Sequence, residues 1–364
     1  MIIYVVVVGV FFLKIRQRNN RRANVDSGFG FLSAFAVMAL PIFLLGIRTG
    51  FADTKAYITG FQLMTTNLTH LQQGLDGSKG ELFFLYQWVI KNFISNNPII
   101  FLLITAIIQG GAIVKFYRKH SVDYLFSILL FFLSCSFFYM TNGIRQFLAV
   151  SLILYFSDWI FEKKYIKFII VVLIASQIHV SAIIWLPVCL VIKGKPFNYK
   201  VLLMMGVVLL ATQFVSTFTN LLEDTLTGTI YDGLTDQFAK DDGSNIMHTL
   251  IAAVPVGISL LGRKTIDKEN NSKINMMVNI SVFGMAMSLL ANFTSGLIIG
   301  RMPIYFTIFN YALIPWLIRH VFTKQSAQFM KLLCYLGYAA YMAYYFYAQN
   351  VYYVSSILRI DTRL

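Results

Sequence analysis

The chain has 364 residues, of which 57% are hydrophobic and only 13% are charged, and its mean hydropathy is +0.68. A soluble protein of this length carries about a quarter of its residues as charged side chains, so this composition excludes a water-soluble enzyme. Its apolar residues form runs separated by short polar segments, the pattern of a polytopic α-helical membrane protein. No stretch has the composition of a separate soluble domain, and we expect a single transmembrane domain over residues 1–364.

Twelve apolar segments predict about 12 transmembrane helices in an all-α fold. They lie near residues 2–13, 29–47, 97–114, 121–140, 146–161, 166–178, 180–192, 201–218, 246–262, 274–293, 303–318 and 330–348. The shortest would cover only ~20 Å of a hydrocarbon core of ~30 Å, so we expect their ends to extend into polar flanks or the membrane to thin. The first segment is followed rather than preceded by positive charge, so we expect it to remain as a span.

The basic residues predict the orientation of these helices. The net charge is +14, and most of the lysines and arginines fall in alternate loops: residues 14–22, 115–119, 163–167, 193–200, 263–273 and 319–331. The positive-inside rule places these loops in the cytoplasm and both termini outside. Topology and anionic lipid account for the charge, so no nucleic-acid partner is expected. The outer loops, about 48–96 and 219–245, would form the extracytoplasmic face.

The two long outer loops differ in character. The first contains residues 81–94, ELFFLYQWVIKNFI, which are apolar but too few to cross the membrane. We expect them to form an interfacial or re-entrant helix on the outer face. The second loop is acidic, and it lacks the ligand spacing of a calcium loop. We expect it to be solvated or to face an acceptor.

Three arginines lie at the predicted outer edge of the membrane, where the charge rule makes arginine scarce. They are Arg48 in GIRTGFAD, Arg145 in TNGIRQF and Arg301 in IIGRMPIY. Each alone could anchor a helix end by snorkelling. Together with helix N-termini, however, forked guanidinium groups suit an anion, and diphosphate in particular. We therefore predict a diphosphate site, with Asn142 and Gln146 beside Arg145 as hydrogen-bonding groups for the substrate.

Three residues are candidates for catalysis. His179, in SQIHVSA, lies at the turn between two short apolar segments. Since imidazole titrates near neutral pH, it could act as a general base or donate a hydrogen bond to a sugar, or it could be a packing residue. Asp53 could instead pair with Arg48, and Glu81 could be a favourable charge at a helix N-terminus.

Further features concern substrate contacts and other chemistries. Tyr57 follows Asp53 by four residues, Tyr305 follows Arg301 by four, and both tyrosines are candidate substrate-binding residues. There is no P-loop, no glycine-rich dinucleotide turn, no HExxH and no CxxC, so no cofactor or metal is expected. No charged residue lies at the middle of a predicted span, which disfavours an ion-coupled transporter.

Five segments, taken in order, resemble the motifs of the EpsG-like, Wzy-type polysaccharide polymerases of bacteria. They are IRTGFADTKAYITGF, GELFFLYQWVIKNF, TNGIRQFLAVSL, SQIHVSA and GRMPIYF, between about residues 45 and 310. The pair NGIRQ and IHxSA is the most specific part. That family commonly has R-x-G-x-G-x-D in its first motif; here Phe51 and Ala52 replace a glycine-containing step, while Arg48 and Asp53 are kept. Leu82 stands where the family often has proline.

The resemblance implies a membrane glycosyltransferase with a GT-C-like architecture. Such proteins join oligosaccharide repeat units carried on undecaprenyl diphosphate into a capsule, exopolysaccharide or O-antigen. The donor and acceptor are then both lipid-linked, the active site faces the periplasm or the cell exterior from the bacterial cytoplasmic membrane, and a chain-length regulator is a further partner to consider. The alternatives are a flippase or transporter for the same lipid-linked sugars, a glycan ligase, and an acyltransferase. The sugar, the linkage and the choice between inversion and retention stay open.

Overall fold

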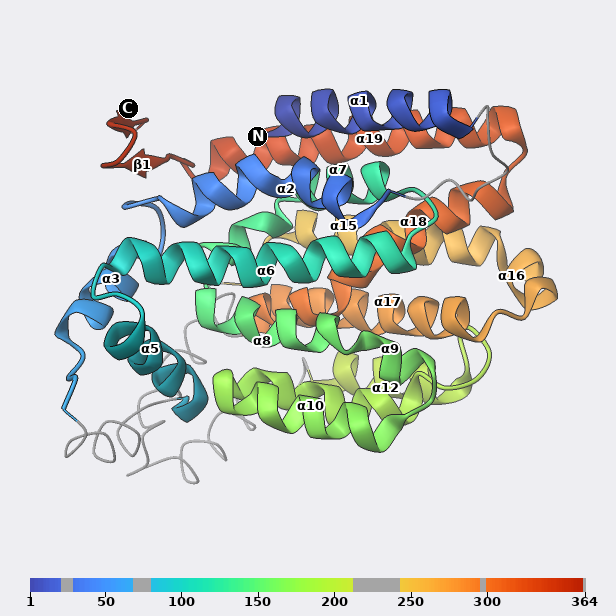
Figure 1. The fold of residues 1–364 in the computed structure, drawn as a ribbon. Coiled ribbons are helices and arrows are strands. Elements are labelled where there is room, and N and C mark those ends of the chain that lie inside the picture. The colour runs from blue at the N-terminus through green and yellow to red at the C-terminus, as the bar shows by residue number, and fades with distance from the viewer. Residues whose placement is uncertain (21–28, 68–79, 212–242, 295–298, 363–364) are drawn as a thin grey trace. The chain divides into compact units, whose positions relative to one another are not determined.

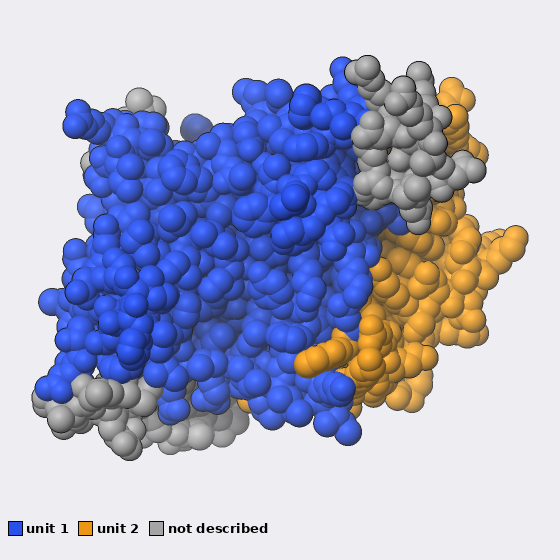
Figure 2. All heavy atoms as spheres, viewed as in Figure 1, with its two compact units in different colours: residues 1–158, 166–182, 335–364 blue, residues 159–165, 183–334 orange. Residues whose placement is uncertain are grey.

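The computed structural model describes residues 1–20, 29–67, 80–211, 243–294 and 299–362. Apart from one hairpin of two-residue strands, β1 (Val354–Ser355) and β2 (Ile360–Asp361), the regular structure of this part of the chain is helical, which confirms the predicted all-α fold (Figure 1). The chain forms two compact units that alternate along the sequence (Figure 2). The first consists of residues 1–158, 166–182 and 335–364, and the second of residues 159–165 and 183–334.

The first unit contains most of the N-terminal helices. They are α1 (Ile2–Asn20), α2 (Phe31–Gly46), α3 (Thr54–Leu63), α5 (Glu81–Phe93), α6 (Pro98–His120), α7 (Tyr124–Leu133), η2 (Ser136–Met140), α8 (Ile144–Tyr155) and nearly all of α10 (Tyr165–Ile178). The β-hairpin and the second half of α19 (Lys324–Ala348) also belong to it. The long helix α6 packs against both α2 and α8, so it forms the centre of this unit.

The second unit is built around α17 (Ser272–Leu290), which packs against α12 (Tyr199–Ala211), α15 (Ile246–Leu261) and α18 (Ile304–Val321). Its shorter elements are α11 (Trp185–Val191), α16 (Arg263–Glu269), η5 (Ala291–Phe293) and η6 (Ile299–Arg301). Four elements have residues in both units: α10, α19, α9 (Ser157–Phe161) and η3 (Val180–Ile184). Two polar side chains inside α17 have partners within the unit: the Ser281 hydroxyl donates to Asn310 Oδ1 at 2.6 Å, and Asn279 Nδ2 donates to the Ile192 carbonyl at 3.0 Å.

All twelve predicted apolar segments contain helix, but they differ in length. The helices Pro98–His120 and Ser272–Phe293 are long and apolar enough to cross a membrane, and the pair α15 and α16, bent by 71°, would be a third such span. Seven further apolar helical stretches in the described part of the chain have 10–17 residues. Large apolar side chains on several of them are strongly exposed, including Leu32, Ile166 and Leu203. These surfaces support a membrane protein, while the number of twelve spans stays a prediction.

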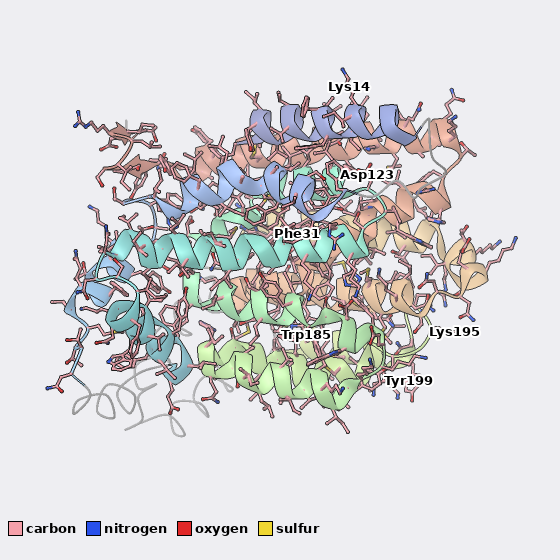
Figure 3. All side chains as sticks on the ribbon, in the orientation of Figure 1. Lys14, Phe31, Asp123, Trp185, Lys195 and Tyr199 are labelled. Carbon is pink, nitrogen blue, oxygen red and sulfur yellow. The ribbon has the colours of Figure 1, made fainter. Side chains whose placement is uncertain are left out.

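Side-chain caps define where several of these helices begin. Asn97 Oδ1 accepts from the Ile99 N–H at 2.9 Å at the start of α6, with Pro98 in the first helical position. Asp123 Oδ1 accepts from the Phe126 N–H at 3.0 Å at the start of α7 (Figure 3). Such caps satisfy backbone donors that the first helical turn leaves without partners. The local sequence therefore determines where α6 and α7 begin.

The first unit has two chemically different ends. At one end, Asp158 receives Lys119 Nζ at 2.8 Å and His120 Nε2 at 3.2 Å, both from the C-terminal turn of α6. The opposite end holds the C-terminus of α2 and the N-termini of α6 and α8 (Figure 1). Most of the candidate site residues from the sequence gather at this second end.

Candidate functional site

Arg48 lies two residues after α2, and its side chain is only 2% exposed. Its Nε donates to Thr54 Oγ1 at 2.9 Å, Nη1 donates to the Leu45 carbonyl, and Nη2 donates to the Met140 carbonyl at 3.4 Å. Burial lowers the pKa of Arg48 to about 10, although two nearby tyrosines favour the charged form. Arg48 is therefore a cation at neutral pH, and the hydrogen bonds of its guanidinium group join the ends of α2 and η2 to the start of α3.

The C-terminal hairpin fixes the segment that carries Arg48. The Thr49 N–H donates to the Val354 carbonyl at 2.8 Å, and the Ser355 hydroxyl donates to the Ile47 carbonyl at 2.8 Å. These partners are about 300 residues apart in the sequence, so no local pattern predicts their contact. The hairpin is thus part of the support of the site, and sequence analysis missed it.

Two hydrogen bonds bring the GIRTGFAD segment against the NGIRQ motif. The Gly143 N–H donates to Asp53 Oδ2 at 3.1 Å, and the Arg145 N–H donates to the Tyr57 hydroxyl at 3.4 Å. Gly143 precedes α8 with a φ of +87°, a conformation that glycine adopts at little cost. Asp53 and Tyr57 therefore hold the N-terminal end of α8, from which Arg145 projects.

A second chain of hydrogen bonds joins NGIRQ to the IHVSA motif. Gln146 Nε2 donates to Ser181 Oγ at 3.4 Å, and Ser181 Oγ lies 2.6 Å from His179 Nδ1. The Ser181 N–H also approaches Nδ1, at 3.4 Å, as a donor. Because Nδ1 accepts in this arrangement, neutral His179 carries its proton on Nε2. Ser181, two residues after His179 in the same motif, is a site residue that sequence analysis did not single out.

The start of α5 closes the site from another side. A β-carbon added to Gly80 would lie 2.7 Å from the Ile178 carbonyl oxygen and 3.5 Å from Arg145 Nη1. The absence of a side chain at Gly80 therefore lets α5 approach both the end of α10 and the Arg145 guanidinium. Glu81 follows directly, as the exposed first residue of α5.

Residues 81–94, expected to form an interfacial or re-entrant helix, contain the helix α5 with 13 residues. Lys91, near its C-terminal end, donates from Nζ to three carbonyls at the end of α3, those of Phe61, Gln62 and Met64, at 2.6–2.9 Å. Cations at the C-terminal end of a helix stabilise its orphan carbonyls. Lys91 therefore ties α5 to α3, the helix that starts at Asp53.

The site end carries positive charge that the described residues leave without a counter-ion. Four ion pairs with a nitrogen–oxygen distance of 4.0 Å or less occur among them, and none includes Arg48 or Arg145. The N-cap residue of α8, Gly143, has no side chain of its own to cap the helix, and Asp53 and Tyr57 accept from the backbone there instead. Half-buried Arg145 beside this helix N-terminus is an arrangement that favours an anion.

The remaining predicted site residues have different surroundings. Asn142 is half-buried just before Gly143. Arg301 ends η6 and is half-buried in the second unit, where Tyr305, at the start of α18, is fully buried. Their roles in substrate binding stay predictions. Most of the acidic loop at 219–245 lies outside the described residues, and no group of three potential metal ligands occurs within them.

The model of the EpsG family matches residues 31–356, so the chain belongs to the EpsG family. The resemblance noted in the sequence motifs is thereby confirmed. The match begins at the first residue of α2 and extends into the β-hairpin that supports Arg48. No curated protein and no solved structure matches the chain. Family and apolar helices together identify a membrane protein of polysaccharide biosynthesis, in a family associated with glycosyltransferase-like polysaccharide polymerases.

Proposed function

We propose that this chain is a Wzy-type polymerase. It joins oligosaccharide repeat units carried on undecaprenyl diphosphate, at the outer face of the bacterial cytoplasmic membrane. The observation that carries the proposal is the gathering of three separate motifs at one end of the first unit. Asp53 contacts Gly143, Tyr57 contacts Arg145, and the Gln146–Ser181–His179 chain joins α8 to the end of α10.

Arg145 is the proposed ligand of the donor diphosphate. Its guanidinium is half-buried and adjacent to the N-terminus of α8, so charge and helix dipole act in the same direction. Arg48 is buried and held by three protein acceptors, so it contributes a fixed positive charge that needs no reorganisation during the reaction. Both charges stabilise the negative charge that develops on the diphosphate as it leaves.

The proposed reaction forms one bond and breaks one. A hydroxyl oxygen of the acceptor sugar attacks the anomeric carbon of the donor, and the bond from that carbon to the diphosphate oxygen breaks. The electron pair of the broken bond leaves with undecaprenyl diphosphate, and the hydroxyl proton passes to a carboxylate, Glu81 or Asp53. Because His179 carries its proton on Nε2, it is suited to the second of its two predicted roles, that of a hydrogen-bond donor to the sugar.

The distribution of charge supports an outward-facing site. Arg118 and Lys119 lie in the last turn of α6, at the end of the first unit opposite the site. By the positive-inside rule that end faces the cytoplasm. Arg145 and His179 then face outward, on the side where the lipid-linked repeat units would be joined.

Deleting the gene and analysing both the lipid-linked and the surface polysaccharide tests this function. The proposal expects single repeat units to accumulate on the carrier lipid at the outer face, with the polymer lost. Repeat units trapped at the inner face would instead identify a flippase. Polymer of normal length left on its carrier would identify a ligase.

A further inference from the structure

An apolar groove lies beside the site, entirely within the first unit. Its volume is about 470 Å³, and it is bounded by α5, α6, α8 and α10. The lining includes Leu82, Leu85, Ile104, Leu148, Leu152 and Ile178. Two further lining residues of α5 and its C-terminal end, Val89 and Ile94, are 39% and 59% exposed, so the groove is open along this helix.

The two tyrosines in the lining add no polar surface to the groove. The Tyr86 hydroxyl is 2.8 Å from Thr105 Oγ1, and the Tyr155 hydroxyl donates to the Ile108 carbonyl at 3.0 Å. Both hydroxyls thus have protein partners, and only the rings remain to contact an occupant. A polar ligand such as a sugar would lose its hydrogen bonds to water here and gain none, so the groove suits a hydrocarbon.

The groove continues into the site along α8. Arg145, Leu148 and Leu152 follow one another at intervals of three and four residues, so they lie on one face of the helix. Leu148 and Leu152 line the groove, whereas Arg145 lies at its site end. From Arg145 to Tyr155, the last lining residue of α8, the helix rises about 15 Å at ~1.5 Å per residue.

The same change from polar to apolar occurs on the other two helices that meet at the site. On α10, Ile178 lines the groove and His179 follows it. On α5, Glu81 is followed by the lining residue Leu82. Each of three helices therefore carries one candidate site residue directly beside apolar lining residues.

We propose that this groove binds the polyprenyl tail of the lipid-linked substrate, over the isoprene units nearest the diphosphate. The inference rests on the proposed function, because that function supplies a ligand with a diphosphate joined to a long branched hydrocarbon. With the diphosphate at Arg145, the tail leads away along Leu148 and Leu152 and leaves past the exposed edge of α5. The volume is within the range of about 300–1,000 Å³ typical of small-ligand pockets, so the groove holds a segment of the tail rather than its whole length.

Photo-crosslinking of the purified full chain in detergent micelles tests the proposal. The probe is a polyprenyl diphosphate with a photoreactive group on an isoprene unit close to the diphosphate, and mass spectrometry locates the labelled peptides. We expect labelling of α5 and α8 that unlabelled polyprenyl diphosphate suppresses. Leu85→Trp and Leu152→Trp should each reduce it about tenfold, because the indole occupies space that the tail needs.

The control is Leu203→Trp on α12, a position that is 67% exposed and outside the groove, where labelling should match the wild type. Leu85 is 37% exposed, so the larger Trp side chain should be tolerated there. If Leu152→Trp does not elute as a monodisperse protein, labelling of Leu85→Trp alone tests whether the groove binds the tail. Labelling of other helices, or full labelling in a well-folded Leu85→Trp variant, would overturn the proposal.

The binding assay does not depend on polymer formation, so the two proposals can fail separately. If the groove is labelled but the polymer stays intact after the gene is deleted, the tail site is supported and the proposed function is contradicted. If the chain is required for polymer but its groove is not labelled, the proposed function is supported and the tail site is contradicted.

Discussion

The two ends of the first unit differ in the partners of their positively charged side chains. At the end with the C-terminus of α6, Lys119 and His120 share Asp158, at 2.8 Å and 3.2 Å. At the other end, no carboxylate of the described residues lies within 4.0 Å of the Arg48 or Arg145 guanidinium. At the first end a carboxylate holds Lys119 and His120, whereas at the second end buried Arg48 and half-buried Arg145 have no carboxylate partner, which is costly for a cation away from water. That cost is understandable if an anionic substrate supplies the missing charge.

The two arginines at the site end also differ from one another. Arg48 is buried, and three of its donors are used by protein oxygens. Arg145 is half-buried, and no hydrogen bond of its guanidinium falls within the described part of the chain. Arg48 therefore resembles a positioning residue with a fixed charge, while Arg145 has donors to offer to a ligand.

Replacing Arg145 gives the largest effect that we expect. Arg145→Ala should reduce polymer about 10²–10³-fold, the usual cost of removing one group that stabilises developing charge. The measurement is the polysaccharide ladder of a deletion strain that carries the variant, with protein amount checked by immunoblot. Arg118→Ala, at the opposite end on the exposed surface of α6, is the matched control and should give normal polymer. Equal polymer from the two variants would remove the functional distinction between the ends.

Gly80→Ala should have the next largest effect. The new β-carbon would lie 2.7 Å from the Ile178 carbonyl oxygen, so α5 must move away from α10 and from Arg145. A displacement on the order of 1 Å in a catalytic arrangement can cost up to about 10²-fold in rate, so we expect a 10- to 100-fold loss of polymer.

Gly60→Ala is the control for this change, since an added β-carbon meets nothing within 4 Å there and alanine favours the helix α3. It should leave the polymer ladder unchanged. If Gly80→Ala also left the polymer ladder unchanged, the close approach of α5 to α10 would not matter for function.

Thr54→Val tests the support of Arg48. The variant keeps the shape of the side chain but leaves the buried Arg48 Nε without its acceptor at 2.9 Å, which should cost about 1–3 kcal/mol of stability. Thermal unfolding in detergent measures the loss. Thr59→Val, on an exposed position of the same helix, should change stability by less than about 0.5 kcal/mol. Similar unfolding temperatures for the two variants would show that the Arg48–Thr54 bond contributes little.

Much of the fold could be predicted from the sequence, because apolar runs and capping residues act locally. Breaks inside the predicted spans could not. The span expected at 121–140 is divided into α7 and η2 at Cys135, whose φ is +61°, and the span expected at 146–161 is divided into α8 and α9 after Tyr155. Neither break contains a proline or glycine that would predict it from the sequence, so both depend on packing against other parts of the chain.

The site was predictable in its residue types but not in its connections. Arg48, Arg145 and His179 stand out because polar groups are rare at predicted membrane edges. Ser181 links Gln146 to His179, and its hydrogen bond with Gln146 joins segments 35 residues apart. The hydrogen bond from Ser355 to the Ile47 carbonyl joins segments 308 residues apart. Contacts of that separation arise from the tertiary fold, and a single sequence carries no local signal for them.

The smallest expected effect concerns the loop between Arg48 and Asp53, where the motif R-x-G-x-G-x-D has a glycine-containing step. Phe51 and Ala52 have φ values of +136° and +45°, in the region that glycine adopts most readily. The Phe51 ring packs 5.3 Å from that of Phe138, so replacing Phe51 would also remove aromatic contact. Ala52 is exposed and gives the cleaner test.

Ala52→Gly should stabilise the protein by about 0.5–1 kcal/mol, because relief of a left-handed alanine, worth roughly 1–2 kcal/mol, exceeds the entropy that glycine adds to the unfolded chain. Ala56→Gly, four residues later inside α3, should destabilise it by about 1 kcal/mol. The two changes are chemically identical, so opposite shifts of the unfolding temperature in detergent would isolate the backbone conformation of the loop. If both lowered the unfolding temperature equally, Ala52 would not hold a left-handed conformation, and the loop that places Asp53 against Gly143 would need another account.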